Sequence, residues 1–211
     1  MDAIRHLLDT PQLLALAAAL GWASGIRLYA AVFLAGMAGW MGWIALPPGL
    51  QVLQHPAMLG ASGFMLFIEF FADKIPGVDS LWDMVHTVIR IPAGAALAAG
   101  ALGADSSTMA TVAALLGGTL AATSHATKMT TRAAVNTSPE PFSNIGVSLL
   151  EDGLVIGALW LATTHPLLFG IALAIAMVLM VWLLVVLVKF LKALPNRLAK
   201  LFGGNASPKT T

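Results

Sequence analysis

The sequence contains no cysteine and few charged residues. The absence of cysteine excludes disulfides, thiolate metal sites and cysteine nucleophiles. Only 10% of the 211 residues are charged, whereas an average soluble domain carries roughly 25%. The formal net charge of +1 gives no excess of basic residues for phosphate contacts, so we expect no nucleic-acid partner. The sequence also indicates no cofactor.

Hydrophobic residues, in contrast, are abundant. They make up 58% of the chain, and the mean hydropathy is +0.86. A soluble chain of this size could not bury so much apolar surface, because its surface is large relative to its volume. The apolar runs are long and do not alternate with polar residues, which favours helices over a β-barrel. The sequence therefore predicts an all-α membrane protein with the lipid bilayer as its main partner.

Six apolar blocks are separated by proline- and glycine-rich turns; five are near the length of about 20 residues needed to cross a bilayer, and the first is longer. The blocks are 11–44, 57–75, 80–102, 108–127, 143–163 and 166–188. We expect about six transmembrane helices in a single domain, residues 1–194, followed by a basic, largely disordered cytoplasmic tail, residues 195–211. The apolar stretch after Arg5 has features of a secretory signal, but Asp9 and Pro11 argue against cleavage, so we expect this segment to be retained.

The first block is too long for one straight helix across a membrane. It contains Gly21, Ser24 and Gly25 directly before Arg27. We expect a break or kink there, or a short interfacial helix after Val32. Discontinuous helices of this kind line cavities in transporters.

Lysine and arginine are distributed unevenly among the expected loops. With a cytoplasmic N-terminus and six spans, nine of them fall on the inner side: Arg5, Lys74, Lys128, Arg132, Lys189, Lys192, Arg197, Lys200 and Lys209. The outer loops, near 45–56, 103–107 and 164–166, contain none. The positive-inside rule therefore predicts that both termini are cytoplasmic.

Ionisable residues recur at helical spacing within the spans. Residues three or four apart share one face of a helix, and the sequence contains four such stripes: Glu69 and Asp73; Asp79, Asp83, His86 and Arg90; His125, Lys128 and Arg132; and Asn144, Ser148, Glu151 and Asp152. Charges at bilayer depth are costly and usually face the interior of a bundle. We therefore expect Arg27 and Arg90 to pair with Glu69, Glu151 or Asp152.

Two interpretations of these stripes remain open. The ion pairs could merely hold the helices in register, or the polar residues could line a pathway. The candidate pathway residues are Arg27, Glu69, Asp73, Asp83, His86, Arg90, His125, Lys128, Arg132, Asn144, Glu151 and Asp152. Asp79 fits an N-cap of the third helix better than a ligand. Trp40, Trp43, Trp82 and Trp160 fit anchors at the membrane interface.

A weak internal similarity relates the two halves of the chain. The segment around Arg27 can be aligned with the segment around Arg132, and Phe67-Ile68-Glu69 with Leu149-Leu150-Glu151. If spans one to three repeat as spans four to six, an odd number of spans inverts the second copy, which gives the inverted repeat found in many transporters.

Several longer motifs resemble one bacterial membrane-protein family. They are Ser24-Gly25-Ile26-Arg27-Leu28-Tyr29, the stretch from Glu69 through Asp79 with Trp82-Asp83, and the stretches from His125 to Lys128 and from Arg132 through Asn144 to Glu151-Asp152. The family, domain of unknown function forty-one twenty-six, carries no assigned activity. The resemblance covers about residues 15–160 and implies a multi-pass protein of the bacterial inner membrane.

Three functions fit the sequence. The first is a secondary transporter or channel for a small solute or ion, either an anion or a proton or other cation. The second is a membrane-embedded, metal-dependent enzyme acting on a phosphorylated lipid, in which Asp73, Asp79 and Asp83 would hold Mg²⁺. The third is a structural membrane subunit. A chain this short would enclose a pathway more easily as a homodimer, and six glycines permit close helix contacts within or between subunits: Gly36, Gly39, Gly60, Gly63, Gly117 and Gly118.

Overall fold

The computed structural model describes residues 8–103, 106–137 and 141–202, and these ranges contain helices and connecting turns. The elements are α1 (Thr10–Trp40), the 3₁₀ helix η1 (Pro48–Gln54), α2 (Pro56–Ala72), α3 (Val78–Leu102), α4 (Ser107–Val135), α5 (Pro141–Thr164) and α6 (Pro166–Phe202). By length and composition four helices, α1, α3, α5 and α6, are able to cross a membrane, or five if η1 and α2, which meet at 69°, form one span. The fold is that of an all-α membrane protein.

The helix boundaries follow the residues that favour helix starts. Proline stands in the first turn of α1 and α2 and begins α5 and α6, where its missing N–H costs no hydrogen bond. Asp9 caps α1 in a capping box with Gln12, whose backbone N–H donates to the Asp9 carboxylate at 2.9 Å. Gly77 joins α2 to α3 at φ +85°, a backbone conformation that favours glycine.

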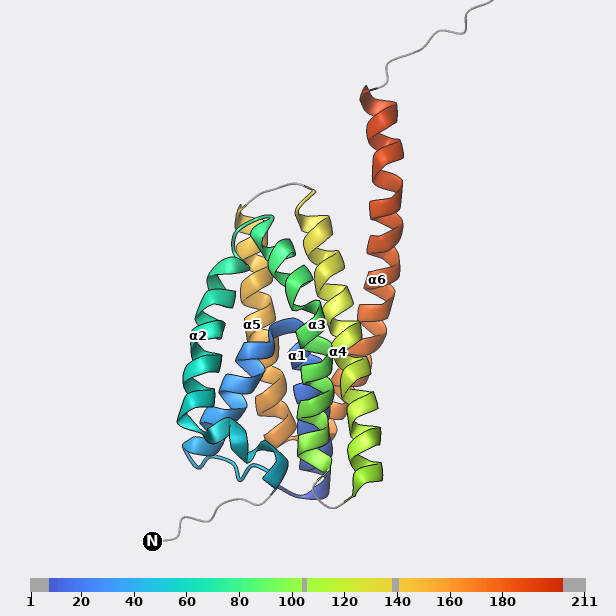
Figure 1. Ribbon diagram of the computed structural model, residues 1–211. Coiled ribbons are helices and arrows are strands. Elements are labelled where there is room, and N and C mark those ends of the chain that lie inside the picture. The colour runs from blue at the N-terminus through green and yellow to red at the C-terminus, as the bar shows by residue number, and fades with distance from the viewer. Residues whose placement is uncertain (1–7, 104–105, 138–140, 203–211) are drawn as a thin grey trace, which may run out of the picture.

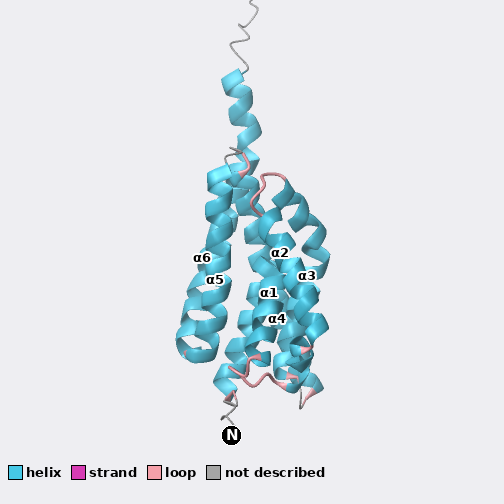
Figure 2. Cartoon of the chain, turned by 90° about the vertical axis from the view of Figure 1, so that its left-hand side faces the viewer, coloured by secondary structure: helices cyan, strands magenta, loops and turns pink. Residues whose placement is uncertain are grey.

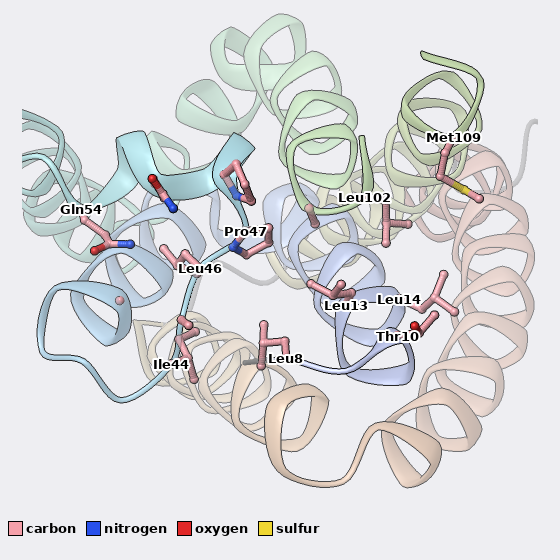
Figure 3. A pocket seen from close by; sticks show the side chains of 15 residues that line it. Leu8, Thr10, Leu13, Leu14, Ile44, Leu46, Pro47, Gln54, Leu102 and Met109 are labelled. Atoms are coloured by element: carbon pink, nitrogen blue, oxygen red, sulfur yellow. The ribbon is translucent and has the colours of Figure 1, made fainter. Parts of the chain in front are cut away.

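Helix α1 enters the bundle and returns to the end at which it began. Arg27 has non-helical backbone angles, φ −143° and ψ 77°, and divides α1 into two halves. A straight helix of 31 residues would be ~46 Å long. Instead, Thr10 and Leu13 near its start and Gly39 near its end line the same pocket of about 880 Å³ (Figure 3). The ribbon turns near the middle of the bundle (Figure 1).

The expected break at Arg27 is confirmed. Helices α2 to α6 each run along the bundle, so the start of α1 and the end of α6 lie at opposite ends (Figures 1 and 2). The expected six crossings and the cytoplasmic side of both termini stay predictions. The alternative of a short helix directly after Val32 is wrong, since α1 continues to Trp40.

The C-terminal helix continues past the expected end of the membrane domain. Helix α6 extends through Phe202, so residues 195–202 of the expected disordered tail are helical. The chain has no glycine between Gly170 and Gly203 to end the helix earlier. Residues 203–211, Arg5 and the Ser138 to Glu140 turn lie outside the described residues.

Glycines bring three segments close together around the first half of α1. A Cβ on Gly21 would lie 2.7 Å from the Cα of Gly117 in α4. A Cβ on Gly25 would collide with the Ser124 hydroxyl and the Ala121 carbonyl, and one on Gly94 of α3 would lie 2.6 Å from the Ala121 Cβ. Helices α1, α3 and α4 therefore pack backbone to backbone, which places polar side chains of α4 directly beside the break.

The glycines singled out in the sequence do not all have this role. Gly36, Gly39, Gly63 and Gly117 are in close contact with neighbouring segments, whereas a Cβ on Gly60 would meet nothing within 4 Å. Helix α6 presents an apolar surface: no residue in its most hydrophobic stretch of 18 residues is buried inside the protein. Such a surface suits lipid or a second subunit.

Candidate functional site

The polar stripes converge on a common interior. All four polar residues of the α3 stripe are buried, together with Gly94. The same holds for the predicted residues on the other elements: Glu69, Asp73, His125, Lys128, Arg132, Asn144, Ser148 and Glu151. Asp152 is the partly accessible exception, with 21% of its side chain exposed. The structure thus brings residues from α1 to α5 to one site.

Arg27, the residue at which α1 breaks, is fully buried and contacts several other segments of this site. Its guanidinium lies 2.7 Å from the Asp73 carboxylate and 3.1 Å from Asp152. It also donates to the hydroxyl of Ser148 at 2.7 Å and to the Ser148 carbonyl at 3.1 Å. Arg27 therefore joins α1 to the α2–α3 turn and to α5.

Side chains of α4 contact backbone carbonyl groups of α1 in the turn before the break. The Lys128 ammonium donates to the Ile26 carbonyl at 3.0 Å, and His125 Nδ1 lies 3.2 Å from the Gly25 carbonyl. The Ser124 hydroxyl donates to the Trp22 carbonyl at 2.8 Å. The spacing of polar residues on α4 therefore matches the end of the first half of α1.

The two cations of α4 also bind carboxylates. Lys128 lies 2.7 Å from Asp73 and 3.4 Å from Glu151. Arg132 lies 2.8 Å from Glu151 and 3.7 Å from Asp73, and it donates to the side-chain oxygen of Asn144 at 3.0 Å. Asp73 and Glu151 are thus each shared between cations from different helices.

Arg90 forms a second centre on α3. Its guanidinium contacts Glu69 at 2.5 Å and Asp83 at 2.6 Å, and His125 Nδ1 lies 3.4 Å away. The other nitrogen of His125 is 2.8 Å from the Thr87 hydroxyl. The expected pairing of Arg90 with Glu69, and of Arg27 with Glu151 and Asp152, is therefore present, with Asp83 as a further partner.

His86 lies beside the ion pairs without joining one. Its Nδ1 is 2.8 Å from the Trp82 carbonyl, and its ring stacks on the Trp82 ring at 4.1 Å between centroids. The Tyr29 ring meets His86 edge-on at 5.7 Å. Trp82 therefore stacks on His86, whereas Trp40, Trp43 and Trp160 are 62%, 66% and 59% exposed. A role as interfacial anchors stays a prediction for all four.

Sequence analysis missed a polar chain through Asn136. Asn144 donates to Asn136 at 3.0 Å, and Asn136 donates to both carboxylate oxygens of Asp79 at 3.0 and 3.1 Å. Gly77 is the N-cap of α3, so the assignment of Asp79 to that position is wrong. Its carboxylate nevertheless accepts from the backbone N–H groups of Gly77 and Ser80 at 2.8 and 2.7 Å. Asn136 is the C-cap of α4. Its polar side chain was the feature of the sequence that could have indicated this chain of hydrogen bonds.

The site holds more negative than positive formal charge. We define the charge cluster as Arg27, Glu69, Asp73, Asp79, Asp83, Arg90, Lys128, Arg132, Glu151 and Asp152. Its six carboxylates and four cations give a formal charge of −2 if every group is ionised. One oxygen each of Glu69, Asp73, Asp83 and Asp152 is buried without a hydrogen-bond partner among the described residues. Buried polar atoms normally have partners, so these oxygens have capacity for a proton or another cation.

The turn between α2 and α3 places two ionisable groups of opposite sign side by side. Burial of Asp73 opposes its ionisation, but the charges of Lys128 and Arg27 outweigh that effect and lower its pKa. Burial also lowers the pKa of Lys74, and the carboxylate of Asp152 only partly counteracts it. Asp73 is therefore held as a carboxylate, whereas the charge on Lys74 is weakly held.

The carboxylates proposed for Mg²⁺ do not converge on one point. Asp73 faces Arg27 and Lys128, Asp83 faces Arg90, and Asp79 faces Asn136. Within the described ranges, no group of three or more His, Cys, Asp or Glu side chains is arranged to hold a metal ion. The arrangement gives no support to the metal-dependent lipid enzyme.

The fold and the buried site define a class: a polytopic helical membrane protein with a broken first helix and an interior network of ion pairs. The chain belongs to the family described as Domain of unknown function (DUF4126), whose model matches residues 14–186. No curated protein and no solved structure matches the chain.

Proposed function

We propose that this protein is a secondary transporter or channel for a small solute or ion in the bacterial inner membrane. The observation that carries the proposal is the break of α1 at Arg27, which places backbone carbonyls and a guanidinium inside the charge cluster. Broken helices at mid-membrane are costly and are found where they line a binding site or pathway. The excess of carboxylates favours a proton or another cation as the transported or coupling ion.

The path of the chain supports one orientation. The loops at the end where α1 begins, residues 41–55 and 103–107 and His165, contain no Lys or Arg. Lys74 lies in the turn at the other end, and the basic residues that end α6 follow there too. By the positive-inside rule the latter end is cytoplasmic. We infer five crossing helices, a re-entrant α1, an external N-terminus and a cytoplasmic C-terminus, in place of six spans.

An inverted repeat remains a proposal with mixed support. The second half of α1 followed by α2 and α3 runs in directions opposite to α4, α5 and α6 (Figure 1), as an inverted repeat requires. However, Arg27 precedes the second half of α1, whereas Arg132 lies in the last turn of α4. The two arginines that align in sequence therefore do not occupy equivalent positions.

Flux through reconstituted protein tests the proposal. Proteoliposomes would be loaded with a pH-sensitive dye and exposed in turn to gradients of protons, Na⁺, K⁺, chloride and phosphate. We expect protein-dependent flux of at least one ion, and its loss in Glu69→Gln, which removes a fully buried charge beside Arg90. Lys189→Met, on the exposed part of α6, is the matched control. The absence of flux for every ion over pH 5 to 9 would overturn transport.

A structural subunit is the second candidate, favoured by the density of pairing. Arg27, Lys128 and Arg132 each contact three carboxylates, more than a simple binding site needs. Replacing Arg90 and Glu69 together by methionine and leucine removes one pair, and Asp83, which also contacts Arg90, keeps Lys128 at 3.3 Å as a cation partner. Retention of cellular phenotype with loss of in vitro flux would favour the structural role.

The apolar face of α6 supports a homodimer, which cross-linking in native membranes would test.

A further inference from the structure

A groove of about 430 Å³ lies on the side of the bundle between the second half of α1, α2 and α5. Its lining is mainly aromatic and aliphatic, with Phe33, Phe67 and Phe70 among the larger side chains, and Asp152 is its charged member. Phe67 is 62% exposed, so the groove is open on the flank of helices that cross the membrane. Hydrocarbon chains in the bilayer would have direct access to it.

Asp152 connects this groove to the charge cluster. Its side chain is 21% exposed, whereas those of Asp73 and Glu151 are 0% and 9% exposed. One carboxylate oxygen lies 3.1 Å from the Arg27 guanidinium, and the other has no hydrogen-bond partner within the part of the chain described. Behind it the charge cluster holds five further carboxylates and four cations. Asp152 is the charged residue that lines the groove, so it gives the inner end of the groove a preference for positive charge.

Lys74 shows that an ammonium group fits at this end. Its Nζ lies 3.0 Å from the centroid of the Phe70 ring. It donates to the Phe70 carbonyl at 2.9 Å and to the Ser148 hydroxyl at 3.3 Å. An aromatic face and oxygen acceptors are the groups that recognise organic ammonium ions. Lys74 is thus a tethered cation against the ring of Phe70, which lines the groove.

We propose that the groove binds an amphiphilic organic cation, such as an alkylammonium compound, that enters from the bilayer. The alkyl chain lies along Phe33 and Phe67, and the ammonium lies between the Phe70 ring and Asp152, in competition with the ammonium of Lys74. An anionic amphiphile of the same length would meet the Asp152 carboxylate and is disfavoured. This inference concerns equilibrium binding, so it goes beyond the proposed transport and does not depend on it.

Binding of decyltrimethylammonium to the full chain in zwitterionic nanodiscs tests the inference. The probe is used below its micelle concentration, with empty nanodiscs as the background and decyl sulfate as the probe of equal length and opposite charge. We expect saturable binding of the cation above background and none of the anion. Equal uptake of both probes, or uptake equal to that of empty nanodiscs, would overturn the proposal.

Four variants separate a binding role from a structural one. Asp152→Asn is expected to weaken cation binding about tenfold, since it removes the one charge that the groove contacts, and Phe70→Leu about threefold or more. Lys74→Met removes the tethered competitor and is expected to strengthen binding, an effect that damage to the fold would not produce. Phe64→Leu, on an exposed phenylalanine outside the groove lining, is expected to bind as the unaltered protein does.

The outcomes remain interpretable if one variant does not fold. Asp152→Asn could unfold because Arg27 loses a partner. In that case the affinities of Lys74→Met and Phe70→Leu, expected to rise and to fall respectively, still test the proposed cation site. If Lys74→Met leaves affinity unchanged or lowers it, the competition is refuted. Binding without flux would count against transport alone, and flux without binding would count against the groove alone.

Discussion

Lys128 donates to the Ile26 carbonyl at the point where α1 breaks, 3.0 Å from Nζ to oxygen, while the same ammonium lies 2.7 Å from Asp73. One side chain of α4 thus completes the hydrogen bonding of a broken helix and neutralises a buried carboxylate. The break and the charge cluster are therefore parts of one structure. A change in the ion pairs of the charge cluster should therefore also affect the fold of α1.

Replacement of Lys128 by methionine tests this coupling. The change keeps the length of the side chain but removes the donor to the Ile26 carbonyl and one of the cations that contact the buried carboxylates of Asp73, Asp83 and Glu151. Breaking a buried ion pair on one side costs about 3–5 kcal/mol, so we expect a loss of unfolding free energy in that range. The measurement is equilibrium unfolding in mixed detergent micelles. Lys189→Met, at an exposed position, should change stability by less than about 0.5 kcal/mol.

The backbone contact between α1 and α4 gives a second prediction. A Cβ at Gly25 would collide with the Ser124 hydroxyl and the Ala121 carbonyl, so Gly25→Ala is expected to destabilise by about 1–3 kcal/mol through overpacking. At Gly60 of α2 an added Cβ meets nothing within 4 Å, and alanine there should stabilise the helix by about 0.5–1 kcal/mol. Thermal unfolding of the two variants should shift in opposite directions. Equal shifts would contradict the close contact.

The sequence predicted local features well and the path of the chain poorly. Helical spacing identified the α3 stripe, because three- and four-residue steps fix which side chains share a face, and Asp83, His86 and Arg90 are all buried. The glycines before Arg27 predicted the break. Nothing local to Arg27 determines whether the chain continues or returns, since that depends on contacts such as Gly25 with α4 and Gly36 with η1. The orientation rule depends on the parity of crossings, so the re-entrant path that we propose places the N-terminus on the other side of the membrane from the sequence prediction.

The lowered pKa of Lys74 predicts pH-dependent binding in the lateral groove. Burial is the main cause of the lowered pKa. The charges of Arg27 and Arg132 lower the pKa further, whereas those of Asp152 and Asp73 raise it. Below its pKa the lysine is charged and competes for the Phe70 site; above it the competition is lost. The charge of decyltrimethylammonium does not change with pH. Its affinity should therefore rise with pH, and the rise should begin at a lower pH than that at which a surface lysine loses its proton. In Lys74→Met the affinity should not change across that range.

The re-entrant path of α1 makes a prediction that the cysteine-free sequence allows to be tested directly. Single cysteines at Thr10, Gln51 and Thr137, all exposed, report the start of α1, the η1 segment and the α4–α5 turn without background labelling. With α1 returning to its starting side, Thr10→Cys and Gln51→Cys should react with a membrane-impermeant maleimide in intact spheroplasts, and Thr137→Cys only after permeabilisation. If the first block crossed the membrane, Thr10→Cys and Gln51→Cys would lie on opposite sides, so labelling of one without the other would refute the re-entrant path. Agreement between the first two positions therefore distinguishes five crossings from six, whichever side faces the cytoplasm.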